Sequence, residues 1–81
     1  LLYAYEAMKE GGTMPAVLNA ANETAVAAFL QREIGFNEIP VVINNTMQLH
    51  EKKSAMDIDV IVEADRWARE KAREIIERVN R

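Results

Sequence analysis

Apolar residues recur at helical spacing along most of the chain, and residues 15–30 are apolar nearly all round. This segment, PAVLNAANETAVAAFL, has polar side chains at four positions only. At 100° per residue, three of these, Asn19, Asn22 and Glu23, fall within an arc of about 100°, whereas Thr24 points elsewhere. The helix predicted here therefore carries one polar patch instead of a continuous polar face.

The patch is one turn tall, because Pro15 and Val26 lie on the same arc one turn before it and one turn after it. A solvated face would run the length of the helix, so we expect Asn19, Asn22 and Glu23 inside a packed structure or at its edge. Two interpretations remain open. The patch could bind a ligand, a metal or a partner, or it could be a structural hydrogen-bond network to a turn or another domain, which is the commoner use of buried amides.

Three further helices are predicted from apolar spacing and from breakers. The first covers residues 1–10 and ends at Gly11-Gly12, after which Thr13 can cap the helix that runs to about Arg32. Asn37 can cap a third helix with Pro40 in its first turn. The last helix covers about 63–80, preceded by residues 57–62 as a helical turn or short helix, since a lone strand would have no partner.

Six alanines in the second helix favour a central position for it, because small side chains let neighbouring helices approach closely. The predicted fold is all-α, a small antiparallel four-helix bundle with an Ala-rich central helix, and residues 1–81 form one domain. The chain starts in the middle of a helical pattern without an initiator Met, so we expect a fragment of a longer protein.

Composition narrows the functional classes. A net charge of −3 and a pI near 5.1 argue against nucleic-acid binding. Polar residues 19–24 interrupt the longest apolar run, so no segment reaches the roughly 20 apolar residues of a membrane span. Cysteine is absent, which removes thiolate metal sites and fits a cytoplasmic location.

Other candidate chemistry is sparse. His50 is the only histidine and is expected at the end of the third helix, where it would contact carbonyl groups. Four acidic residues near the last helix, Asp57, Asp59, Glu63 and Asp65, lack the glycine and spacing of a calcium loop and are expected to cap the helix start. Trp67 is expected to anchor a helix face. No nucleophile with a base, acid/base pair or complete metal set is present, so the residues predict no catalytic, cofactor-binding or metal-binding site.

Three motifs in order, GGTMPAVLNAANE with AVAAFL, IGF-x-x-IP and EADRWAR, give a resemblance that covers nearly the whole chain. It resembles the C-terminal helical domain of 1-deoxy-D-xylulose 5-phosphate reductoisomerase. The resemblance implies a parent enzyme of non-mevalonate isoprenoid synthesis that converts this substrate to 2-C-methyl-D-erythritol 4-phosphate with NADPH and a divalent metal, Mg or Mn.

The resemblance also implies that the catalytic residues, the NADPH site and the metal site lie in other domains of the parent. This chain would then be a structural domain that braces the catalytic domain and has no activity of its own. The alternative is a self-standing helical protein-interaction module. In isolation, surface that normally contacts missing domains would be exposed, so we expect self-association.

Overall fold

The computed structural model describes residues 11–50 and 58–80, and all regular structure within them is helical. The elements are α2 (Met14–Leu30), the short 3-10 helix η1 (Phe36–Glu38), α3 (Ile39–Leu49) and α4 (Ile58–Val79). The predicted all-α class is confirmed. The helix predicted over residues 1–10 lies outside the described residues.

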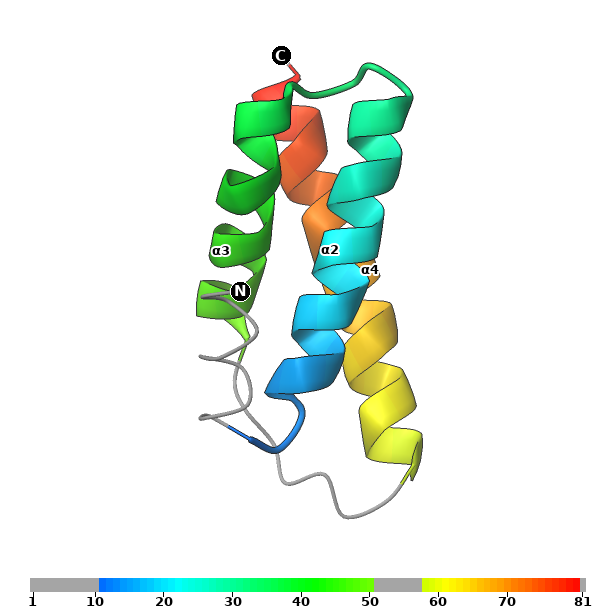
Figure 1. Cartoon of the computed structure of the whole chain (residues 1–81). Helices are drawn as coiled ribbons and strands as arrows, with labels where there is room; N and C mark the ends of the chain where they lie inside the picture. The colour runs from blue at the N-terminus through cyan, green and yellow to red at the C-terminus, as the bar shows by residue number, and fades with distance from the viewer. Residues whose placement is uncertain (1–10, 51–57, 81) are drawn as a thin grey trace.

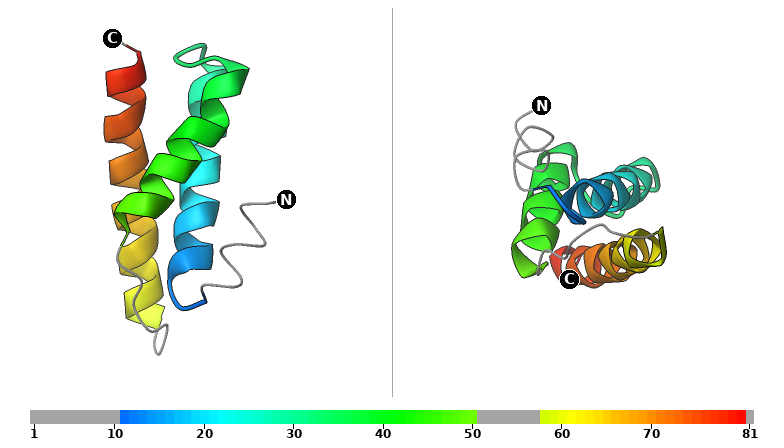
Figure 2. Two further views of the ribbon diagram at one scale, coloured as in Figure 1. Left: turned by 90° about the vertical axis from the view of Figure 1, so that its left-hand side faces the viewer. Right: turned by 90° about the horizontal axis from the view of Figure 1, so that it is seen from below.

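The three long helices pack around one another and alternate in direction along the chain. In Figure 1, α2 runs upward, α3 returns downward and α4 runs upward again. α3 is inclined to the other two, as Figure 2 shows. Each of the three helices contacts both others, so α2 and α4 are neighbours that run the same way.

Two glycines with a left-handed backbone precede α2. Gly11 and Gly12 have φ angles of 70° and 56°, in the left-handed region that only glycine adopts at no steric cost. Thr13 is the N-cap residue, as predicted, but its side chain makes no capping hydrogen bond to the helix. The predicted capping by this hydroxyl is therefore wrong, because the hydroxyl bonds to His50 instead.

The end of α2 is a Schellman motif. The Glu33 N–H donates to the Ala28 carbonyl at 2.9 Å and the Arg32 N–H donates to the Phe29 carbonyl at 3.0 Å. Arg32 holds the left-handed position with φ 63°, which costs a non-glycine residue about 1 kcal/mol. The helix thus ends at Leu30, two residues earlier than predicted.

The next helix starts differently from the prediction. A 3-10 turn follows Gly35, whose N–H donates to Glu38 Oε1 at 2.6 Å, and α3 then begins at Ile39 with Glu38 as its N-cap. Asn37 lies inside the 3-10 turn and does not cap the helix. Pro40 occupies the first turn of α3, as predicted, where its missing N–H leaves no hydrogen bond unmade.

Residues 58–62, whose residue types would also suit a strand, belong to one continuous helix, α4. Ile58 to Val62 is rich in β-branched residues, yet it forms the first turns of α4, so the helical reading is confirmed. The helix is amphipathic, and its buried side follows a spacing of three or four residues through Ala64, Ala68, Ala72, Ile75 and Ile76. Within the described part of the chain, no helix is both long and apolar enough to cross a membrane.

The core is built largely from small side chains. α2 buries Ala20, Ala21, Ala25 and Ala28 around Val17, and α4 buries three further alanines. Larger residues fill the remaining space: Val42, Ile43 and Met47 from α3, Ile75 and Ile76 from α4, and Ile34 from the loop. Close helix approach through alanine, with branched side chains at the margins, explains how so short a chain forms a packed core.

Ala25 gives the sharpest test of this core, because it lies in the middle of α2 with no exposed surface. Replacement of Ala25 by Leu should lower the free energy of unfolding by about 1–3 kcal/mol, since the larger side chain overpacks the core. Urea denaturation measures the change. The matched control is Ala27→Leu at an exposed position of the same helix, which should cost less than about 0.5 kcal/mol. Equal effects at the two positions would contradict the packing described.

Candidate functional site

The structure places the polar patch of α2 on the surface. Asn19, Asn22 and Glu23 are all exposed, which corrects the first of the two expected placements, inside a packed structure, and leaves the second, at its edge. The core side of α2 lies through Val17, Ala21 and Ala28, which point about 180° away from the patch. A helix with few polar residues was taken for a buried helix, but alanine and leucine also occupy exposed positions here, at Ala27 and Leu30.

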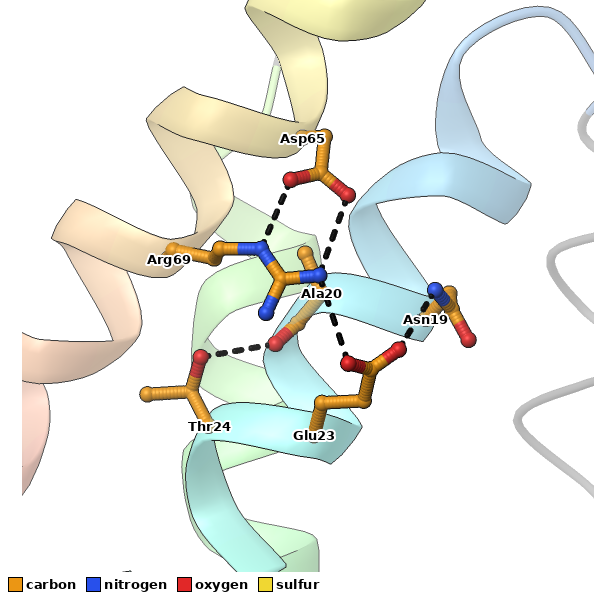
Figure 3. A network of polar contacts seen from close by, with 6 residues as sticks. All are labelled: Asn19, Ala20, Glu23, Thr24, Asp65 and Arg69. Carbon is orange, nitrogen blue, oxygen red and sulfur yellow. Dashed lines mark hydrogen bonds and ion pairs between the residues drawn. The ribbon is translucent and has the colours of Figure 1, made fainter. Parts of the chain in front are cut away.

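A polar network joins this patch to α4, as Figure 3 shows. Asn19 Nδ2 donates to Glu23 Oε2 at 3.0 Å, and Arg69 Nη2 reaches Glu23 Oε1 at 3.5 Å. Arg69 also forms a two-point contact with Asp65, with Nε donating to Oδ1 at 2.7 Å. The hydrogen bond to Asp65 is the main cause that raises the pKa of the Arg69 guanidinium above its ordinary value.

The energy of this network is small. The side chains of Arg69 and Glu23 are 42% and 55% exposed, and exposed ion pairs contribute about 0–1 kcal/mol. Asn22 makes no side-chain hydrogen bond to another described residue. Thr24 lies off the patch and donates to the Ala20 carbonyl within α2. The patch therefore links α2 to α4 through Glu23 alone.

A second cluster joins the start of α2, the end of α3 and the middle of α4. Thr13 Oγ1, before α2, and His50 Nε2, after α3, form a hydrogen bond of 2.7 Å, although 37 residues separate them. The His50 ring packs on Trp67 of α4 with the ring centroids 5.1 Å apart. Thr13 is completely buried and His50 is half-buried, so water reaches this hydrogen bond only from the side of His50.

His50 is the C-cap residue of α3, as its expected place at the helix end implied. The expectation that Trp67 anchors a helix face is confirmed, since it packs against the core. Sequence reasoning missed the contact of His50 with Thr13, because no local signal relates positions so far apart.

A cavity of about 450 Å³ lies beside this cluster. Its lining is Leu49, His50, Asp59, Val60, Glu63, Ala64 and Trp67. Of the acidic residues expected to cap the last helix, Asp59 lies in the first turn of α4, whereas Glu63 pairs with Arg66 and Asp65 with Arg69. Asp57 lies outside the described residues. The described residues contain no group of three or more His, Cys, Asp or Glu side chains that could hold a metal ion.

Substitutions of Thr13 and Asn22 can be compared to test which of the two polar side chains stabilises the fold. Thr13→Val removes the buried hydroxyl bonded to His50 and should lower the free energy of unfolding by about 1–2 kcal/mol. Asn22→Ala, at an exposed position on the helix, should change it by less than about 0.5 kcal/mol. Chemical denaturation measures both. A larger loss of unfolding free energy for Asn22→Ala than for Thr13→Val would contradict a stabilising role of the Thr13 hydroxyl.

Comparisons with known proteins give one family. A family model described as the DXP reductoisomerase C-terminal domain matches residues 1–71. The chain is similar to the 1-deoxy-D-xylulose 5-phosphate reductoisomerase of Chlorobium limicola, with 58% identity over 94% of this chain and 20% of the relative. It is also similar to that of Halothermothrix orenii, with 52% identity over 93% of this chain and 20% of the relative.

A solved structure has the same fold. It is a 1-deoxy-D-xylulose 5-phosphate reductoisomerase from Zymomonas mobilis in complex with NADPH, with a TM-score of 0.90 and 39% identity. The match covers 95% of this chain and 20% of that one. The chain thus spans about a fifth of the length of the relatives that it matches. On the family match over residues 1–71 and these identities, the chain belongs to the family of DXP reductoisomerase C-terminal domains.

Proposed function

We propose that the chain is the C-terminal domain of an NADPH-dependent 1-deoxy-D-xylulose 5-phosphate reductoisomerase. In this role it braces the catalytic domain of the parent enzyme and takes no part in the chemistry itself. The observation that carries the proposal is the match to a C-terminal domain family over residues 1–71, together with relatives about five times longer than the matched region. The reaction of the parent, in non-mevalonate isoprenoid synthesis, is part of the same proposal.

The cofactors belong to the parent in this proposal. The described residues do not fit a divalent metal, because they bring no three ligating side chains together. NADPH and Mg or Mn would bind in domains outside this chain, in line with the NADPH complex of the Zymomonas mobilis relative. A cytoplasmic location, consistent with a sequence that has no cysteine, is also proposed.

The finer architecture is likewise a proposal. We place residues 1–81 in one domain, an antiparallel four-helix bundle in which the helix predicted over residues 1–10 is the fourth member. The alternating directions of α2, α3 and α4 support this arrangement. In it, Asn19, Asn22 and Glu23 act as a structural polar patch, which the contact between Glu23 and Arg69 supports.

Self-association of the isolated chain is proposed on the basis of its exposed apolar side chains. Leu30, Phe36 and Ile58 each expose 70% or more of their surface, and such side chains favour association when nothing covers them. Light scattering at increasing concentration should show the mass rise above that of the monomer, and a constant monomer mass would contradict the proposal.

The bracing role is tested in the full-length enzyme that carries this domain. Full-length protein should oxidise NADPH in the presence of 1-deoxy-D-xylulose 5-phosphate and Mg²⁺, whereas the 81-residue chain alone should oxidise none. Ala25→Leu in the full-length protein should lower its melting temperature but leave kcat at 25 °C within about twofold, because the substitution affects packing and touches no reacting group.

Ala27→Leu is the control and should change neither quantity. Turnover by the 81-residue chain alone would contradict a purely structural role. So would a kcat loss in Ala25→Leu at a temperature where the enzyme is fully folded.

A further inference from the structure

Apart from the first turns of α4, where Ile58, Ile61 and Val62 are exposed and apolar, the exposed residues of the three helices divide by charge. On α4, all exposed residues between positions 63 and 78 are charged: Glu63, Arg66, Glu70, Arg73, Glu74, Glu77 and Arg78. The exposed residues of α2 and α3 are almost all neutral: Pro15, Asn19, Asn22, Glu23, Ala27, Leu30, Pro40, Val41, Asn45, Gln48 and Leu49. The one charge among them, on Glu23, is paired with Arg69 of α4.

This division indicates which side of the domain faces water. A helix face in permanent contact with solvent normally carries charged residues, as the outer face of α4 does. Neutral exposed surface that includes large apolar side chains is typical of a contact site, and Leu30 is 72% exposed. α2 and α3 lie next to each other, and Figure 1 shows most of α4 behind them.

We propose that the outer faces of α2 and α3, here called the α2–α3 face, are the surface on which the rest of the reductoisomerase chain packs. The charged outer face of α4, over positions 63–78, is directed to water. This inference rests on the proposed function and adds to it the surface through which the domain acts.

The size of the α2–α3 face fits an interface within one chain. α2 has 17 residues and α3 has 11, so at about 1.5 Å per residue and a width of about 10 Å the two faces cover roughly 400 Å². Interfaces between domains of one chain bury about 600–1,500 Å² in total, or about 300–750 Å² a side. A stable complex of free proteins needs about 800 Å² a side.

The occupant is therefore a covalently linked neighbour instead of a second copy. A tethered domain is present at an effective concentration of about 1 mM or more, so a contact of this size suffices to hold it. Two free copies joined through the same face would associate weakly, which limits any self-association of the isolated chain to high concentration.

The chemistry of the face also defines its partner. The amides of Asn22, Asn45 and Gln48 can each donate and accept hydrogen bonds, and apolar side chains such as Leu30 and Val41 lie among them. Interfaces between domains are more polar than obligate subunit interfaces. The matching surface of the parent enzyme is thus neutral, with hydrogen-bonding groups opposite the amides and aliphatic groups opposite Leu30 and Val41.

Cysteine labelling tests the assignment, because the chain has no cysteine of its own. We would introduce Asn22→Cys on α2, Gln48→Cys on α3 and, as the matched control, Glu77→Cys on α4. All three positions are exposed in the 81-residue chain. Each variant is made in the full-length enzyme and in this chain, and the rate of alkylation by N-ethylmaleimide is followed by mass spectrometry of the peptide concerned, so cysteines elsewhere do not interfere.

In the full-length enzyme, the thiols at positions 22 and 48 should react at least about 10-fold more slowly than the thiol at position 77, because a covered thiol is inaccessible to the reagent. In the 81-residue chain all three should react at similar rates. If the thiol at position 22 or position 48 reacts as fast as that at position 77 in the full-length enzyme, the α2–α3 face is not the docking surface.

The outcome for the proposed function is read separately. Oxidation of NADPH with 1-deoxy-D-xylulose 5-phosphate by the unmodified full-length protein tests the function, whatever the labelling pattern. An active enzyme with fast labelling at positions 22 and 48 refutes the docking surface alone. An inactive enzyme with slow labelling at both positions refutes the function and leaves the docking surface supported.

Discussion

Alanine on the facing sides of α2 and α4 is the constraint on which the rest of this structure depends. Seven buried alanines, four on α2 and three on α4, replace the larger side chains that usually fill a helical core. Small residues permit close approach of two helix backbones. Because the backbones are close, a small number of branched side chains is enough to fill the rest of the core. α3 supplies Val42 and Ile43, and α4 supplies Ile75 and Ile76.

The same alanine packing determines which side chains lie on the surface of the domain. Once the alanine side of α2 faces the core, its amides and Leu30 must point outward, and once Ala64, Ala68 and Ala72 of α4 face inward, the charged residues of that helix must face out. The result is a charged side over positions 63–78 of α4 and a neutral side on α2 and α3. A domain that acts by packing against a larger protein needs this asymmetry, because one side is hydrated and the other is desolvated in the complex.

The helical elements could be predicted because local signals agree with the final structure. Gly11-Gly12 marks the start of α2, and the apolar spacing of residues 64–76 marks the buried side of α4. The end of α2 was misplaced because Arg32 adopts the left-handed conformation, for which the residue type gives no warning. The nearby Gly35 has an extended backbone and lies beyond the end of the helix.

The polar sites were harder to predict, for a physical reason. The apolar character of α2 led to the expectation that the Asn19, Asn22 and Glu23 patch lies inside a packed structure or at its edge. Alanine occurs at both buried and exposed positions of this helix, so it says little about which side is buried. The contact between Thr13 and His50 forms when α3 brings the chain back beside the start of α2. Only the packed arrangement of the helices reveals that contact, whereas the family motifs do identify the domain.

Native-state hydrogen exchange of the 81-residue chain tests the alanine constraint most directly. If the packing of α2 on α4 holds the fold together, amides from Ala21 to Ala28 and from Ala68 to Ile76 should exchange through the same opening, with the same highest free energy. Added denaturant should lower the exchange free energies of the two groups of amides in parallel. Exchange of the α4 amides at a free energy well above that of the α2 amides would show that α2 opens alone, and would contradict the central place given to the alanine contact.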